Sequence, residues 1–178
     1  MTGSIAESTS NAVTGPIGAN VPDVIRWQTA ERASVLDLLA GFGIELVDVP
    51  SGRDIPGSYW GDDEAGLIEN RLYARPDTPL HSILHESCHY ICMDAARRSR
   101  LHTDAGGDYE EENAVCYLQI LLARRIRGYG AGDCMRDMDR WGYSFRLGSA
   151  EAWFERDAED ARAALQARGI DPVTGWRR

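Results

Sequence analysis

The segment His85-Glu86-Ser87-Cys88-His89 carries the side chains best placed to do chemistry. His85 and His89 are four residues apart, so on a helix both imidazoles project from one face, about 6 Å apart. A zinc ion about 2.0–2.1 Å from each nitrogen bridges that spacing. Glu86 is too close to His85 to join the same coordination, but its carboxylate could hold and deprotonate a water molecule. The spacing therefore predicts a zinc site with a general base beside it.

Two imidazoles leave zinc short of protein ligands, so a third ligand must come from elsewhere in the chain. An extended motif with a third histidine on the same helix would need glycine at position 92 and histidine at position 95, but the sequence has Cys92 and Ala95. The candidates are instead the run Glu110-Glu111-Glu112 and, after it, Asp104 or His102.

Helical phase distinguishes the three glutamates of this run. Glu111 lies in register with apolar residues that should face inward, and Glu110 also shares an apolar face. Glu112 lines up with Cys116 and Gln119, on a more polar side. We therefore expect Glu111 to be the third ligand, although an acidic helix start that favours the helix dipole would explain the run equally simply.

Histidines at this spacing with a glutamate after the first are the His-Glu-x-x-His arrangement of zinc peptidases, and such an enzyme would also need a group that stabilises the oxyanion of its transition state. Tyr143, between Trp141 and Phe145, is the first candidate, followed by Tyr129 and His102. For any one of these residues, packing is the alternative role.

Several other side chains have polar chemistry near the motif. His81 stands one turn before His85 on the same face, and we expect a partly exposed residue there. Asp94 and Asp104 could accept a hydrogen bond from a ligand imidazole. Cys88 and Cys92 are expected to be reduced, small core residues rather than a separate metal site.

The elements that must position these groups follow an α+β pattern, with short strands run together and helices after them. Residues 1–22 are expected to be a disordered leader, and residues 23–178 a single domain. Predicted strands cover 44–49, 59–60, 67–68 and 71–74. Predicted helices run from Thr29 to Gly41, from the N-cap Thr78 to about Arg98, from the N-cap Asp108 to Ile126, over 133–140, and from Ser149 to Gly169.

The sequence Leu84-His85-Glu86-Ser87-Cys88-His89-Tyr90, followed by Glu111-Glu112-Asn113-Ala114 and Tyr117, resembles the gluzincin zinc metallopeptidases. It is most similar to the small bacterial ImmA/IrrE-like branch, over roughly residues 30–126. Cys88 stands where that branch usually has glycine.

This resemblance implies a small zincin-like domain with a short mixed or antiparallel sheet, an HExxH helix and zinc as the cofactor. In that branch the third ligand is a glutamate three residues before an alanine, which here is Glu111. A strand before the metal helix usually lines the substrate, and residues 66–74 could supply it.

The composition restricts the partners. With 19 basic and 28 acidic residues the net charge is −9, which argues against binding to nucleic acid or to anionic membranes. No apolar run reaches the ~18 residues of a membrane span, and the first twenty residues lack the features of a secretory signal. We therefore expect a cytoplasmic protein whose partner is a peptide or protein substrate.

These observations predict a zinc-dependent peptidase in which Glu86 is the general base. The alternative is a catalytically weak regulatory or binding module that keeps the zincin fold and the metal site. An intact Glu86 favours the enzyme, because a metal that only stabilises a fold does not need that carboxylate.

Overall fold

The computed structural model describes residues 23–59 and 62–177, so the predicted leader lies outside the described residues. The described residues form an α+β fold, as expected. Its elements are the 3-10 helix Trp27–Thr29, α1 (Arg32–Gly41), β1 (Glu45–Asp48), β2 (Gly66–Ile68), β3 (Arg71–Ala74), α2 (Leu80–Cys92), α3 (Ala95–Arg98), α4 (Tyr109–Ala123), α5 (Ala131–Trp141), α6 (Ala150–Arg156) and α7 (Glu159–Ala167). None of the described helices is both long and apolar enough to cross a membrane.

The sheet is mixed, with strand order β1-β3-β2. β1 pairs with β3 in parallel, and β2 pairs with β3 as an antiparallel hairpin. These strands confirm the predictions at 44–49, 67–68 and 71–74. The strand predicted at 59–60 is not formed at Tyr59, which lies in a bend, and Trp60 lies outside the described residues.

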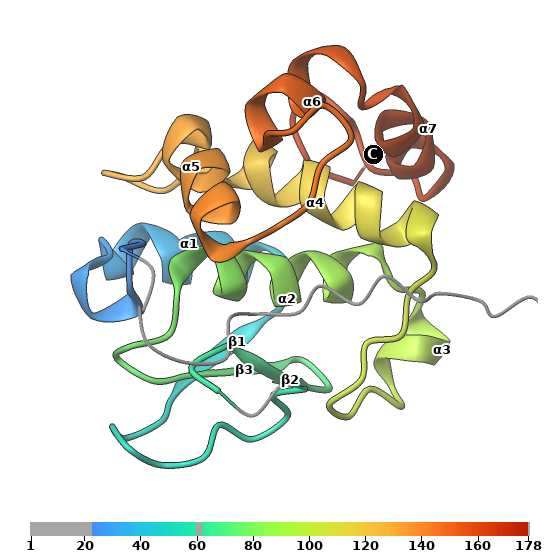
Figure 1. The fold of residues 1–178 in the computed structure, drawn as a ribbon. Coiled ribbons are helices and arrows are strands. Elements are labelled where there is room, and N and C mark those ends of the chain that lie inside the picture. The colour runs from blue at the N-terminus through green and yellow to red at the C-terminus, as the bar shows by residue number, and fades with distance from the viewer. Residues whose placement is uncertain (1–22, 60–61, 178) are drawn as a thin grey trace, which may run out of the picture.

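The elements stack in layers, with the sheet against α2, α4 on the other side of α2, and the C-terminal helices beyond α4 (Figure 1). α2 is therefore covered on two sides. The sequence of α2 places five residues at helical spacing on one face, which predicts a stripe that faces the core, and all five are buried: Leu80, Ile83, Leu84, Ser87 and Ile91. Complete burial of an aliphatic side chain contributes about 1.5–3 kcal/mol, so this stripe fixes the rotation of α2 about its axis. The other face of α2, with the two histidines of the motif, is thereby directed toward α4.

The ends of α2 differ from the prediction. Thr78 does not cap the helix, because its hydroxyl accepts a hydrogen bond from the Arg75 amide (2.9 Å). The helix stops at Cys92 instead of continuing to Arg98, since Asp94 starts α3 by accepting a hydrogen bond from the Arg97 amide (2.8 Å).

Arginine side chains satisfy the carbonyls that the end of α2 leaves free. Arg98 donates to the Tyr90 and Ile91 carbonyls at 2.8 and 3.0 Å, and Arg177 donates to the Ile91 carbonyl at 2.6 Å. Cations also favour the negative end of the helix dipole. The face of α2 that carries His85 and His89 is thus held by packing along the helix and by these arginines at its end.

The predicted start of α4 is confirmed, because the Asp108 carboxylate accepts a hydrogen bond from the Glu111 amide at 2.9 Å. The start of α1 differs, since Glu31 rather than Thr29 caps it through the Ser34 amide (3.0 Å). The helix predicted from Ser149 to Gly169 is two helices, α6 and α7, with a break at Asp157.

The outer edge of β2, which was expected to line a substrate, is already paired. The Leu67 amide donates to the Gly57 carbonyl (3.2 Å), and the Leu67 carbonyl accepts from the Thr103 amide (3.1 Å). The Glu69 amide donates to the Leu101 carbonyl (2.9 Å). No signal in the sequence indicated that the segment after α3 would return to this strand.

Candidate metal centre

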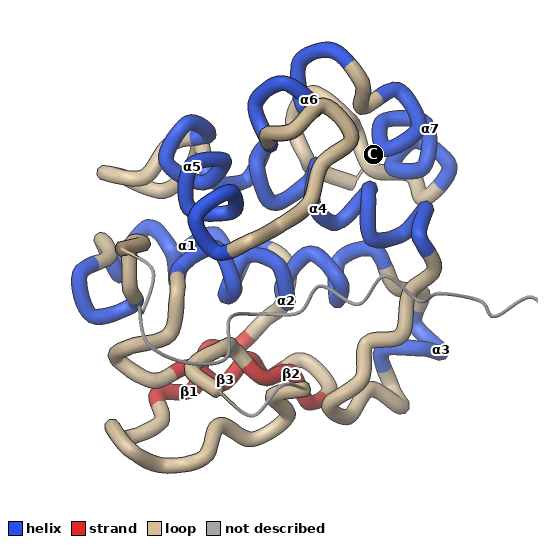
Figure 2. The backbone as a smooth tube through the Cα atoms, viewed as in Figure 1, coloured by secondary structure: helices blue, strands red, loops and turns tan. Residues whose placement is uncertain are grey.

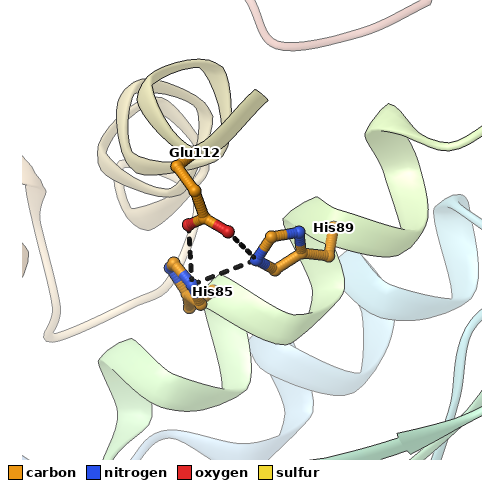
Figure 3. Close-up of side chains that lie close together, drawn as sticks. All are labelled: His85, His89 and Glu112. Atoms are coloured by element: carbon orange, nitrogen blue, oxygen red, sulfur yellow. Dashed lines mark hydrogen bonds and ion pairs between the residues drawn. The ribbon is translucent and has the colours of Figure 1, made fainter. Parts of the chain in front are cut away.

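Three side chains from two helices converge where α2 faces α4. Glu112 of α4 reaches toward the Nε2 atoms of His85 and His89 on α2 (Figure 3). The two Nε2 atoms are 3.2 Å apart, and the Glu112 oxygens lie 3.3 Å from His89 Nε2 and 3.7 Å from His85 Nε2. Ligands about 2.0–2.1 Å from a tetrahedral zinc ion are about 3.3 Å from one another. These three residues could therefore hold a metal ion.

Gln119 determines which nitrogen of His85 is free to bind a metal. Its carbonyl oxygen lies 2.8 Å from His85 Nδ1, and its amide nitrogen points at the Cys134 sulfur (3.9 Å). An amide oxygen only accepts hydrogen bonds, so Nδ1 carries the proton and Nε2 presents its lone pair to the centre. Burial and then the charge of His89 lower the pKa of His85 to about 3, which keeps the ring neutral.

Gln119 was not identified as a site residue from the sequence. The signal was present, because Gln119 follows Glu112 at helical spacing, on the α4 face that was interpreted as more polar. In the structure this side chain is completely buried. A buried amide that bonds a ligand imidazole is the arrangement expected of a group that orients the ligand.

Replacing Gln119 by leucine should weaken zinc binding about 10- to 100-fold, because the hydrogen bond that orients His85 is lost. Competition with a chromophoric chelator measures this affinity. Gln119→Glu is the matched control, since it keeps an acceptor of similar shape, and it should bind zinc nearly as tightly as the original protein. Unchanged affinity in a folded Gln119→Leu variant would show that this contact does not orient the ligand.

Glu111, the expected third ligand, is not part of this group. Both of its carboxylate oxygens bind Arg97, with N–O distances of 2.6 and 2.8 Å. Burial opposes its charge, but the nearby His89 ring and the hydrogen bonds and charge of Arg97 outweigh that and hold its pKa at about 2. Its side chain is 5% exposed, whereas that of Glu112 is 45% exposed. Helical phase thus identified the buried glutamate correctly, but burial here accompanies an ion pair, and the carboxylate that faces the histidines is the more exposed one.

Glu111 nevertheless lies near His89, on the side of the ring that faces away from Glu112. Its Oε1 atom lies 3.8 Å from His89 Nδ1, and this nitrogen has no hydrogen-bond partner among the described residues. Burial disfavours the charged form of His89, but Glu111, Glu86 and Glu112 outweigh it and raise the pKa of the ring. The same carboxylates would also stabilise a metal cation bound to Nε2, because they attract positive charge whether it is a proton or a metal ion.

Glu86 follows His85 in α2 and is half-buried. Burial, followed by the charges of Glu64, Glu112 and Asp104, raises the pKa of Glu86 to about 7, against the lowering influence of His89. A carboxyl group in that range is suited to accept and return protons near neutral pH. Glu86 is thus the sequence neighbour of His85 and is not one of the three residues in the candidate group.

Two aromatic rings border the centre on the α5 side. The Tyr143 ring meets the His85 ring edge-on, with centroids 5.8 Å apart, and burial raises the pKa of its phenol well above the usual value. The hydroxyl therefore keeps its proton and can donate a hydrogen bond. Trp141 binds the Glu64 carboxylate through its indole N–H (2.9 Å), and its ring lies 5.2 Å from the His81 ring.

The expectation for His81 was wrong. Its side chain is completely buried, between the rings of Trp141 (5.2 Å) and Tyr143 (5.6 Å). Neither ring nitrogen has a hydrogen-bond partner among the described residues, and burial lowers its pKa to about 3. His81 is buried because α2 packs against α5 at this position. The sequence pattern of α2 alone did not indicate that contact.

The remaining candidates lie outside the centre. Glu110 pairs with Arg168 (3.5 Å), Asp104 accepts from the Gly106 amide (2.8 Å), and His102 contacts the Thr103 hydroxyl (2.8 Å). Asp94 caps α3, and the Tyr129 hydroxyl donates to Asp137 (3.2 Å).

The four cysteines are free thiols, three of them buried, and none belongs to the candidate metal group. Burial raises the pKa of Cys92 to about 12, so this thiol stays protonated.

Comparison of the chain with models of known protein families, with characterised proteins and with solved structures finds no match.

Proposed function

We propose that the protein is a zinc-dependent peptidase with a zincin-like fold, in which His85, His89 and Glu112 hold the metal. The observation that carries this proposal is the convergence of these three donors, with Glu86 next to His85 on α2. Two imidazoles and one carboxylate are a ligand set of catalytic zinc sites, which leave a fourth position open. The resemblance of the His85–His89 segment to gluzincins supports the same function.

The chemistry divides between the metal and the side chains around it. Bound zinc would supply a Lewis acid that polarises the scissile carbonyl and lowers the pKa of water. Glu86 accepts the proton of the attacking water and returns it to the leaving amine, a role typically worth about 10²–10⁴ in rate. The Tyr143 hydroxyl, which retains its proton, donates a hydrogen bond to the developing oxyanion.

The supporting residues keep the ligands in place. Gln119 fixes the tautomer of His85, and Glu111 faces Nδ1 of His89 while Arg97 holds its carboxylate. Such indirect contacts orient ligand rings and increase their basicity. This chain therefore carries a complete set of roles: three ligands, a base, an oxyanion donor and two orienting groups.

Purified protein is expected to bind about one zinc ion per chain, because three donor side chains converge on one point. Elemental analysis measures the metal, and mass spectrometry of a proteome-derived peptide pool detects cleavage. Chelation should abolish cleavage and added zinc should restore it, while His85→Ala and His89→Ala should lose both metal and activity. Protein that takes up no transition metal on reconstitution would refute the proposal at its first step.

A further inference from the structure

The segment between α3 and α4 runs along the sheet before it reaches the metal centre. In Figure 2 this loop descends from α3 to β2 and then rises to α4. Residues 101–103 lie antiparallel to β2, with Ile68 and His102 paired. Two backbone hydrogen bonds hold them there, from the Glu69 amide to the Leu101 carbonyl (2.9 Å) and from the Thr103 amide to the Leu67 carbonyl (3.1 Å).

After residue 103 the segment borders the candidate centre. A Cβ atom on Gly107 would lie 3.3 Å from a carboxylate oxygen of Glu112. The same stretch of chain thus leads from the β2 edge to a proposed zinc ligand.

Thr103 holds this position in an unfavourable backbone conformation. Its φ angle is +69°, in the left-handed region that β-branched residues rarely adopt. Such strain persists only where surrounding contacts impose it. Here the contacts are the bond from the Thr103 amide to Leu67 and the approach of its hydroxyl to His102 (2.8 Å).

Arg97 fastens the next part of the loop. Its guanidinium donates to the carbonyls of Ala105 (2.8 Å) and Gly106 as well as to Glu111. The loop is therefore anchored to α3 and α4 on one side. On the other side, residues 101 and 103 bond β2 and the Leu101 side chain is buried in the core.

We propose that residues 101–103 occupy the place of an extended peptide substrate on β2, and that substrate binding displaces them from this strand. The proposal rests on the proposed peptidase function. A peptide added antiparallel to β2 would use the Leu67 carbonyl and the Glu69 amide, the groups that now bind residues 103 and 101. Residues 101–103 therefore limit the access of a peptide to the edge of β2. A substrate long enough to bind these backbone groups competes with them for the strand.

A disulfide lock tests the displacement. The bonds on either side of Ile68 and His102 make them a non-hydrogen-bonded pair, with Cα atoms about 4.5 Å apart, a separation that a disulfide spans. Zinc-loaded Ile68→Cys/His102→Cys protein is assayed with internally quenched eight-residue peptides of mixed sequence. The oxidised form should show at least about a tenfold lower kcat/KM than the reduced form. The disulfide prevents residues 101–103 from leaving β2, so the conformation that binds substrate is no longer populated. The single Ile68→Cys variant, given the same oxidant and reductant, controls for the native thiols.

A matched pair of variants at Thr103 tests the opposite direction. Thr103→Pro removes the amide that bonds Leu67 and excludes a positive φ, so residues 101–103 should leave the strand. Thr103→Gly keeps the amide and adopts the observed φ without strain. We expect Thr103→Pro to raise kcat/KM for the eight-residue peptides several-fold and Thr103→Gly to leave it unchanged or lower. Equal kcat/KM values for the locked, released and original proteins would overturn the proposal.

Hydrogen exchange separates this proposal from the proposed function. The Glu69 and Thr103 amides should exchange through local opening, faster than amides of the α2 core and with rates insensitive to low denaturant. If they exchange only with global unfolding, residues 101–103 are a permanent fourth strand and the proposal fails even in an active enzyme. If exchange is local but no variant cleaves any peptide, the displacement stands and the peptidase function is refuted.

Discussion

Replacing Glu86 by glutamine should lower peptide hydrolysis by about 10²- to 10⁴-fold while the protein still folds and binds zinc. The variant keeps the shape of the side chain and a hydrogen bond to water, but it removes the base. Glu86 lies outside the group formed by His85, His89 and Glu112, so the ligands themselves are unchanged. Rates are compared at matched zinc occupancy, because removal of a negative charge near a dication changes zinc affinity modestly.

Glu110→Gln provides the matched control for this substitution. Its carboxylate is on the same acidic helix start as Glu112 but pairs with Arg168, away from the centre. It should hydrolyse peptides at the original rate. The comparison also addresses the alternative of a regulatory module, which would use the metal site only as a scaffold. Undiminished turnover, or an undiminished effect in cells, of Glu86→Gln protein with zinc confirmed in place would rule out catalysis by this residue.

The parts of the fold that the sequence predicted are those that local patterns determine. The apolar spacing in α2 identified its buried stripe from Leu80 to Ile91, and the spacing of four placed both histidines on one face. The N-cap residue Asp108 located the start of α4. In both cases neighbouring residues within one turn or one helix carry the information, so no tertiary contact is needed to interpret it.

The parts that the sequence did not predict depend on contacts between distant segments. Whether Glu111 or Glu112 faces the histidines depends on Arg97, which lies on α3 and binds Glu111. The same holds for the β2 edge, since nothing in β2 indicates that Thr103 will return to pair with it. Burial led to the expectation of Glu111 as the third ligand, whereas the donors that lie together in the structure include Glu112. A side chain that must meet a metal and a substrate keeps some exposure, whereas a buried carboxylate needs a partner cation.

Glu112 and Glu111 are therefore expected to respond in opposite ways when each is changed to glutamine. Glu112→Gln removes a direct metal ligand, so zinc affinity should fall by more than about 100-fold, beyond the 10- to 100-fold of an indirect contact. Without metal, this variant should be at least as stable as the original apo protein, because Glu112 crowds the negative charge of Glu86 and Glu111.

Glu111→Gln should instead cost stability and leave most of the zinc binding intact. Its carboxylate binds Arg97 through two hydrogen bonds, and the Arg97 side chain is 33% exposed, so water compensates for only part of their loss. Hydrogen bonds to charged groups are worth about 1.5–3 kcal/mol, and a loss near the lower end of this range is expected for the partly exposed pair. Zinc affinity should fall by no more than about 10- to 100-fold, since only the surroundings of His89 Nδ1 change. Chelator competition and chemical denaturation of both apo proteins measure the two quantities separately. The reverse pattern, with zinc lost in Glu111→Gln and retained in Glu112→Gln, would identify Glu111 as the third ligand and require Arg97 to release it when metal binds.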